Sequence, residues 1–246
     1  MNELLLLFSV VLIFGAALLA YRLFGKAGLF VVSACASILA NIEANILIVG
    51  FGMEQTLGNV LFAVTFLVTD IFSECESKRD AQIAVWLGVF ASAFFLVLNQ
   101  SWLCYAPSPN DVSMPHVQAF FGSTPRILLS SLTVYALSQV FDVWLYHKWW
   151  AFTEKRTGNR RAFLWLRNTG STLVSQIINT LLFTFLAFFG TYDVPTLISI
   201  FLSSYVIFIF TSLLDTPVVY LARRLKETGK TGKLLVSAKN QEGTQS

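Results

Sequence analysis

Long uninterrupted runs of hydrophobic residues dominate the chain. The segments 4–20 and 28–41, for example, contain no charged residue. A helix needs about 20 apolar residues to cross the hydrocarbon core of a bilayer, where every backbone polar group must be satisfied within the segment. Runs of this kind predict seven transmembrane helices, at about residues 4–22, 28–50, 57–74, 82–104, 125–147, 170–190 and 194–222.

The predicted fold class is therefore all-α, a polytopic bundle of transmembrane helices. We expect a single transmembrane domain over residues 1–225, followed by a polar cytoplasmic tail at 226–246. The first hydrophobic run follows Asn2-Glu3, without the positive charge of a signal peptide, so we interpret it as a retained helix. A bundle of six helices is the alternative if this first segment is not part of the core.

The distribution of basic residues predicts the orientation in the membrane. If the N-terminus lies outside, every Lys and Arg of the 17 except Arg126 falls on the cytoplasmic side. This asymmetry is what the positive-inside rule demands, and it predicts a multi-pass protein of the cell inner (cytoplasmic) membrane with a cytoplasmic C-terminus. The net charge of +3 then reflects a basic face beside anionic lipid, so we expect the lipid bilayer and no nucleic acid as a partner.

Polar side chains recur at helical spacing inside four of the predicted helices. In chain order the stripes are Ser37, Asn41 and Asn45; Thr65, Thr69 and Ser73, with Asp70 beside them; Ser131, Tyr135, Ser138 and Asp142, with Gln139 adjacent; and Asn168, Ser171, Ser175 and Asn179, with Gln176 adjacent. The last helix adds Asp215. Isolated Ser and Thr residues commonly serve only helix packing. Carboxylates and amides at membrane depth are costly, and stripes that face one another predict a hydrated cavity for a small polar solute.

Other kinds of site find little support in the sequence. The three cysteines have no metal-ligand or CxxC spacing, and His116 and His147 lie on opposite sides of the membrane in this topology. Gly229-Lys230-Thr231 resembles the end of a phosphate-binding loop, but the required earlier glycine is Arg224. We therefore expect no cofactor and no metal site, and we expect the protein not to be an enzyme.

Four polar motifs occur in a fixed order along the chain. They are Thr69-Asp70 with Ser73-Glu74; Pro125-Arg126 with Tyr135, Ser138-Gln139 and Asp142; Leu164 to Thr172 with Ser175-Gln176; and Leu214-Asp215-Thr216-Pro217. Together they resemble the motifs of the queuosine precursor transporter family, integral membrane proteins of the vitamin uptake transporter type. The resemblance extends from about Asn41 to Pro217.

This resemblance implies six core helices, with the first segment as an addition, and uptake of 7-deazaguanine precursors of queuosine, or of queuine, for salvage into tRNA. It points to a set of substrate-binding residues: Asn41, Asn45, Asp70, Glu74, Arg126, Gln139, Asp142, Asn168, Ser171, Gln176 and Asp215. The chemistry of the polar stripes adds Tyr135, whose ring can stack on a flat base, and Asn179.

The chain departs from the family pattern at two positions that bear on the substrate. Asn179 stands where relatives usually have Asp, and Phe208 where they often have Lys. We hypothesise that the two form an ion pair in relatives and were lost together here, because removal of one partner strands a buried charge.

Three other functions are compatible with the same pattern. The chain is alternatively a substrate-capture subunit of a multi-component vitamin importer, which requires an energising partner, or a membrane assembly protein without transport activity, or a membrane enzyme that uses its intramembrane Asp residues. A homo-oligomer is equally compatible with the sequence.

Overall fold

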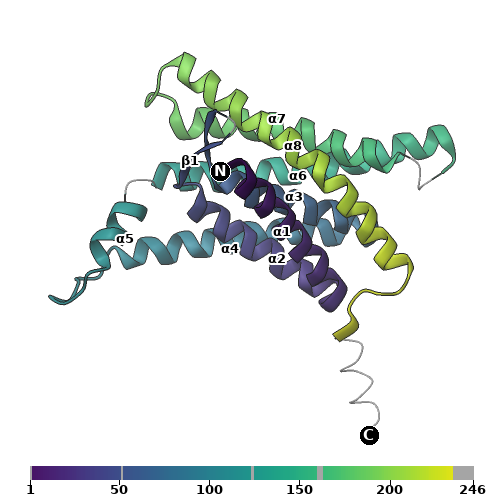
Figure 1. The fold of residues 1–246 in the computed structure, drawn as a ribbon, viewed down its shortest axis with the longest axis horizontal. Helices are drawn as coiled ribbons and strands as arrows, with labels where there is room; N and C mark the ends of the chain where they lie inside the picture. The colour runs from purple at the N-terminus through teal and green to yellow at the C-terminus, as the bar shows by residue number, and fades with distance from the viewer. Residues whose placement is uncertain (1, 51, 123–124, 160–162, 235–246) are drawn as a thin grey trace, which may run out of the picture.

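Helices account for almost all of the structure, a computed structural model that describes residues 2–50, 52–122, 125–159 and 163–234. Within these residues the elements, in chain order, are α1 (Asn2–Phe24), α2 (Lys26–Glu43), β1 (Leu47–Gly50), β2 (Met53–Thr56), α3 (Gly58–Cys75), α4 (Lys78–Trp102), α5 (Met114–Phe121), α6 (Pro125–Thr157), α7 (Leu164–Phe188) and α8 (Val194–Glu227). Figure 1 shows the long helices packed side by side as a bundle, with α6 lying along α7.

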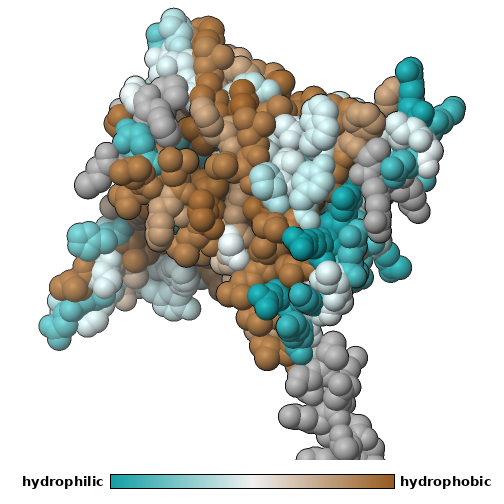
Figure 2. Space-filling model, turned by 45° about the vertical axis from the view of Figure 1, so that its right-hand side comes forward, coloured by the Kyte–Doolittle hydropathy of each residue, from teal (hydrophilic) through white to brown (hydrophobic). Residues whose placement is uncertain are grey.

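The surface of the bundle is suited to lipid. In the described part of the chain, α1, α2, α3, α4, α7 and α8 are long and apolar enough to cross a membrane. Large hydrophobic side chains such as Phe8 of α1 and Phe90 of α4 are exposed, and Figure 2 shows a broad apolar surface bordered by hydrophilic residues. The predicted all-α, polytopic transmembrane bundle is confirmed.

The prediction of a helix through residue 50 is wrong at its C-terminal end. α2 stops at Glu43, and the chain then forms an antiparallel hairpin in which Leu47 pairs with Thr56 and Gly50 with Met53. β-Branched residues favour strands, and Gly52 supplies the positive φ of +74° in the turn. Hydropathy alone does not distinguish a buried apolar strand from the end of a helix.

Two connections that the sequence pattern left as linkers also contain helix. α6 continues to Thr157 and α7 begins at Leu164, so most of the basic segment 148–169 is helical. The proline-rich connection 105–124 contains α5, with Pro115 in its first turn, where proline is tolerated. α5 is too short, and the end of α6 too polar, to form an apolar run of about 20 residues, which explains why the apolar pattern did not predict them.

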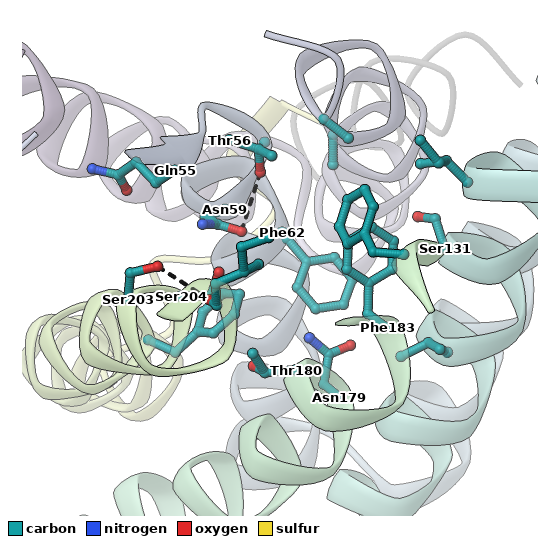
Figure 3. Close-up of a pocket in the computed structure, with 18 of the residues that line it drawn as sticks. Gln55, Thr56, Asn59, Phe62, Ser131, Asn179, Thr180, Phe183, Ser203 and Ser204 are labelled. Carbon is teal, nitrogen blue, oxygen red and sulfur yellow. Dashed lines mark hydrogen bonds between the residues drawn. The ribbon is translucent and has the colours of Figure 1, made fainter. Parts of the chain in front are cut away.

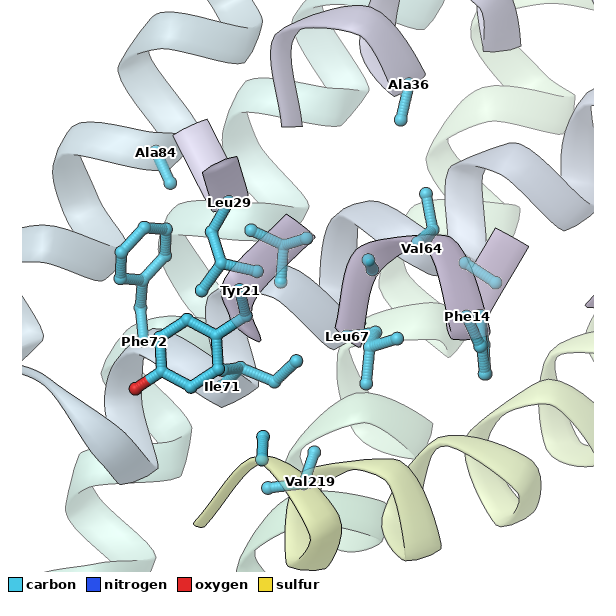
Figure 4. Close-up of a cluster of buried hydrophobic side chains, with 14 of the residues drawn as sticks. Phe14, Tyr21, Leu29, Ala36, Val64, Leu67, Ile71, Phe72, Ala84 and Val219 are labelled. Carbon is cyan, nitrogen blue, oxygen red and sulfur yellow. The ribbon is translucent and has the colours of Figure 1, made fainter. Parts of the chain in front are cut away.

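α1 is built into the core of the bundle. Its buried residues, Leu6, Val10, Phe14, Ala17 and Tyr21, recur every three or four positions and so share one face. Figure 4 shows Tyr21 beside Ile71 and Phe72 of α3, and Phe14 beside Leu67. α3 is buried along most of its length and so occupies the centre of the bundle.

Ion pairs join the helices at one end of the bundle. Glu74 of α3 is bound by Arg167 of α7, with the Nη2 and Oε2 atoms 2.6 Å apart, and by Arg223 of α8 at 3.2 Å. The Tyr146 hydroxyl donates to the same carboxylate at 2.8 Å.

Glu76, two residues along, pairs with Lys226 at 2.8 Å and Lys26 at 3.4 Å, and it accepts a hydrogen bond from Tyr21 at 2.7 Å. We call this group the charged layer: Glu74, Glu76, Arg167, Arg223, Lys26 and Lys226. It joins α2, α3, α7 and α8 at one level of the bundle, and the hydroxyls of Tyr21 and Tyr146 connect α1 and α6 to it.

The Glu74–Arg167 pair should contribute strongly to stability, because both side chains are at most 3% exposed. Glu74→Gln leaves the Arg167 guanidinium buried without its carboxylate, and we expect a loss of about 3–5 kcal/mol in the free energy of unfolding. Denaturant unfolding in detergent micelles measures this loss. The control is Glu227→Gln, which removes a 42% exposed partner of Arg223 at 3.9 Å and should cost less than about 1 kcal/mol. Equal unfolding midpoints for the two variants would contradict the interpretation.

Candidate functional site

A cavity of about 560 Å³ lies in the half of the bundle away from the charged layer. Its walls come from the C-terminal parts of α2 and α7, the N-terminal parts of α3, α6 and α8, Ser92 of α4 and the β1–β2 hairpin. A volume of this size is typical of sites for small molecules. The hairpin fits this position, since non-helical backbone at membrane depth is tolerated where it lines a cavity.

The described lining of the cavity combines polar and apolar groups and is uncharged. Among the described residues, no Asp, Glu, Lys, Arg or His side chain contributes to it. Amides come from Asn41 of α2, Asn45 in the turn after α2, Asn59 of α3 and Asn179 of α7. Figure 3 shows Asn179, Phe62 and Phe183 gathered around the same space. The cavity therefore suits a neutral solute with hydrogen-bonding edges.

Hydrogen bonds between helices fix part of this lining. Asn41 donates through Nδ2 to the Ser92 hydroxyl at 3.1 Å and accepts at Oδ1 from the Ser131 hydroxyl at 2.9 Å, so it joins α2 to α4 and α6. The Tyr135 hydroxyl lies 3.1 Å from the Ser37 hydroxyl, which donates to it. These contacts hold the polar groups in place before a solute binds, which lowers the entropic cost of binding.

Aromatic rings form the second component of the wall. Phe62 contacts Tyr135 edge to face, with ring centroids 5.7 Å apart, and Phe208 in the same way at 6.1 Å. Phe183 of α7 adds a further ring to the lining. Flat π-faces of this kind stack readily on planar heteroaromatic rings.

Several buried polar atoms of the lining have no hydrogen-bond partner within the described ranges. They are Nε2 and Oε1 of Gln55, Nδ2 of Asn59 and Oγ1 of Thr180. Buried polar atoms without partners are costly, so a polar solute that reaches them gains affinity. Sequence reasoning did not single out Gln55 or Asn59, because it placed them in and beside a linker; the Gly50-x-Gly52 turn signal could have pointed to the hairpin that carries Gln55.

The structure divides the residues that the sequence analysis selected. Asn41, Asn45, Tyr135 and Asn179 line the cavity. A second set lies buried between helices and does not contribute to the lining: Asp70, Gln139, Asp142, Asn168, Ser171, Gln176 and Asp215. In this set Gln139 donates to the Thr65 hydroxyl at 2.6 Å, and Asn168 donates to Asp215 Oδ1 at 2.6 Å. Contact of these residues with a substrate stays a prediction.

Two other selected residues have partners elsewhere. Glu74 belongs to the charged layer. Arg126, which is exposed, donates from Nε to the Leu186 carbonyl at 2.9 Å and from Nη2 to the Phe189 carbonyl at 2.7 Å. These carbonyls end α7, where a cation is favoured by the helix dipole and by the unpaired carbonyl groups.

Taken together, the fold and the cavity define a polytopic α-helical membrane protein with a solute-sized cavity between its helices, whose described lining is uncharged, an arrangement typical of membrane transporters. Residues 56–222 match the family model described as "Putative vitamin uptake transporter", and the chain belongs to this family. It is 36% identical, over 219 residues, to a "Probable queuosine precursor transporter" of Bacillus subtilis (strain 168), which covers 89% of this chain and 93% of that relative. No solved structure matches the chain significantly.

The contacts of Arg126 lead to a stability prediction. Arg126→Gln removes the charge from the end of α7 and weakens both carbonyl contacts, so we expect a loss of about 1–2 kcal/mol in the free energy of unfolding. Thermal unfolding in detergent measures it. An Arg126 that served only to attract the solute would leave the unfolding temperature unchanged.

Proposed function

We propose that this protein imports queuosine precursors, namely 7-deazaguanine bases or queuine, for salvage into tRNA. The observation that carries the proposal is the neutral cavity lined by amides and aromatic rings. The 36% identity to a relative named as a probable queuosine precursor transporter supports the choice of solute.

A deazaguanine offers the groups that this lining can bind. Its amine and ring N–H groups can donate to amide oxygens, its carbonyl can accept from amide nitrogens, and its flat ring can stack. Asn59 and Asn179 are suited to the edge of the base, and Phe62 and Phe183 to its face. Because the lining lacks charge, a base without net charge is favoured within this substrate class.

The proposed orientation places the charged layer at the cytoplasmic end of the bundle and the C-terminus in the cytoplasm. α6 then completes seven transmembrane helices, and the positive-inside rule is satisfied in the cell inner (cytoplasmic) membrane. The cavity lies in the outer half, and the charged layer lies between it and the cytoplasm. Import requires the helices to rearrange so that the site faces the other side, as in alternating access.

The test is restoration of queuosine in tRNA. Expression in a strain deficient in both synthesis and uptake of precursors, at limiting precursor, should restore the nucleoside, measured by mass spectrometry of digested tRNA. Asn179→Leu should reduce this restoration at least tenfold, since it replaces an amide that lines the cavity. The control is Asn110→Leu, at an exposed loop position outside the cavity. Failure of the unmodified chain to restore queuosine would overturn the proposal.

The pair of departures at Asn179 and Phe208 allows a second test, because both residues line the cavity. Asn179→Asp alone introduces a carboxylate without a cation and should impair uptake. Addition of Phe208→Lys should recover part of this loss, since the two then form an ion pair. Uptake of labelled precursor by whole cells measures both variants. Equal impairment of the single and double variants would contradict the pairing.

A further inference from the structure

Three carboxylates lie together in the bundle between the cavity and the charged layer. Asp70 of α3, Asp142 of α6 and Asp215 of α8 are at most 2% exposed, and they interact electrostatically with one another. Asn168 and Gln176 of α7, both at most 1% exposed, accompany them. We call these five residues the acidic layer. Helical spacing places Gln176 one turn below Thr180, which lines the cavity.

The acidic layer contains more hydrogen-bond acceptors than donors. No partner among the described residues reaches Oδ1 of Asp70, either carboxylate oxygen of Asp142, Oδ1 of Asn168 or Oε1 of Gln176. Three donors reach its carboxylates: the Thr172 hydroxyl, 3.2 Å from Asp70 Oδ2, and Nδ2 of Asn168 and the Thr216 hydroxyl, 2.6 and 3.4 Å from Asp215 Oδ1. The hydroxyls of Ser171 and Ser175 are close enough to Asp142 to donate to its carboxylate, but in this structure they donate to backbone carbonyls, at 3.2 and 2.8 Å.

Within the described ranges, no cation is paired with the carboxylates of this layer. The titratable and charged groups that face it are Glu74 of α3, Tyr146 of α6, Arg167 of α7 and Arg223 of α8. Both arginines form ion pairs with Glu74, and none of the three Asp carboxylates has an ion pair in the part of the chain that the structure describes. Ionised carboxylates without partners at membrane depth are strongly disfavoured.

The geometry also indicates which positive species fits. In the described ranges, no group of three or more His, Cys, Asp or Glu side chains converges closely enough to hold a metal ion. Carboxylates that are close but do not converge on one point can each take a proton. A proton removes the charge and converts one oxygen into an O–H donor for a neighbouring acceptor.

We propose that the acidic layer, centred on Asp142, is the proton-binding site through which this carrier couples solute import to proton entry. The inference rests on the proposed function as a carrier. A proton arrives from the cavity side and binds a carboxylate oxygen while the solute occupies the cavity. After the site turns inward, the same proton leaves to the cytoplasm and the carboxylate is restored, so that one proton enters for each cycle.

The experiment uses the purified full-length chain in sodium-free liposomes that contain a pH-sensitive dye, with the membrane potential clamped by potassium and valinomycin. Addition of an uncharged 7-deazaguanine base outside should acidify the lumen. An inward proton gradient of about one pH unit should concentrate the base about tenfold inside, for one proton per solute. Asp142→Asn, which keeps the shape but cannot ionise, should abolish the acidification, and Asp142→Glu should restore part of it.

The matched control is Asp193→Asn, which neutralises an exposed carboxylate at the start of α8 and should leave acidification unchanged. If Asp142→Asn does not insert into the membrane, Asp70→Asn is the second variant to measure. It should also reduce the acidification of the lumen. Accumulation that follows a sodium gradient without acidification, or acidification that survives in both Asn variants, would overturn the proposal. Exchange of labelled base across the membrane, measured without a proton or sodium gradient, tests transport separately. If the unmodified chain shows no exchange, the proposed function is refuted, and not only the coupling to protons.

Discussion

The cost of placing charge and unpaired polar groups inside a membrane determines how this molecule is organised. The basic residues Arg167 and Arg223 both pair with one carboxylate, Glu74, at one end of the bundle. Many hydroxyls within the helices donate to carbonyls of the preceding turn, as Ser138 does to Val134. A small set of polar groups has neither an ion pair nor a hydrogen bond of this kind. In a membrane protein, such groups commonly belong to functional sites.

The same cost explains why irregular backbone occurs where it does. The hairpin β1–β2 interrupts the bundle beside the cavity, and its edge is partly satisfied by Asn2, whose Nδ2 donates to the Val49 carbonyl at 2.7 Å. Elsewhere within the described transmembrane helices the backbone forms its own helical hydrogen bonds, except at Pro217 of α8, which has no N–H to donate. The hairpin brings the side chain of Gln55 into the wall of the cavity, beside the side chains that the helices contribute.

Much of the fold followed from the sequence because the lipid imposes simple rules on it. The apolar runs predicted the transmembrane helices, and the stripes of Asn41 and Asn179 predicted residues that do line a common cavity. Ion-pair partners were beyond such reasoning, since Glu74 and Arg167 are 93 positions apart and nothing in their local patterns links them. The role of Arg126 was equally hidden, because a lone cation at a helix start does not indicate that it binds the last carbonyls of another helix. Gln55 was missed because residues 51–56 lie between two predicted helices, and a polar strand in such a short segment has the composition of a linker.

The uncharged part of the cavity lining that the structure describes and the buried carboxylates lie at different levels along the axis of the bundle. In the cavity, Asn179 and Phe208 contribute an amide and an aromatic ring, and the described lining is neutral. The carboxylates at Asp70, Asp142 and Asp215 lie deeper, away from the lining. A carrier arranged in this way can bind an uncharged base without paying for the desolvation of a fixed charge, while the energy of an ion gradient acts on a different set of side chains. Since α7 contributes Asn179 to the first set and both Asn168 and Gln176 to the second, movement of this one helix would affect both sets, which gives the two sites a physical link.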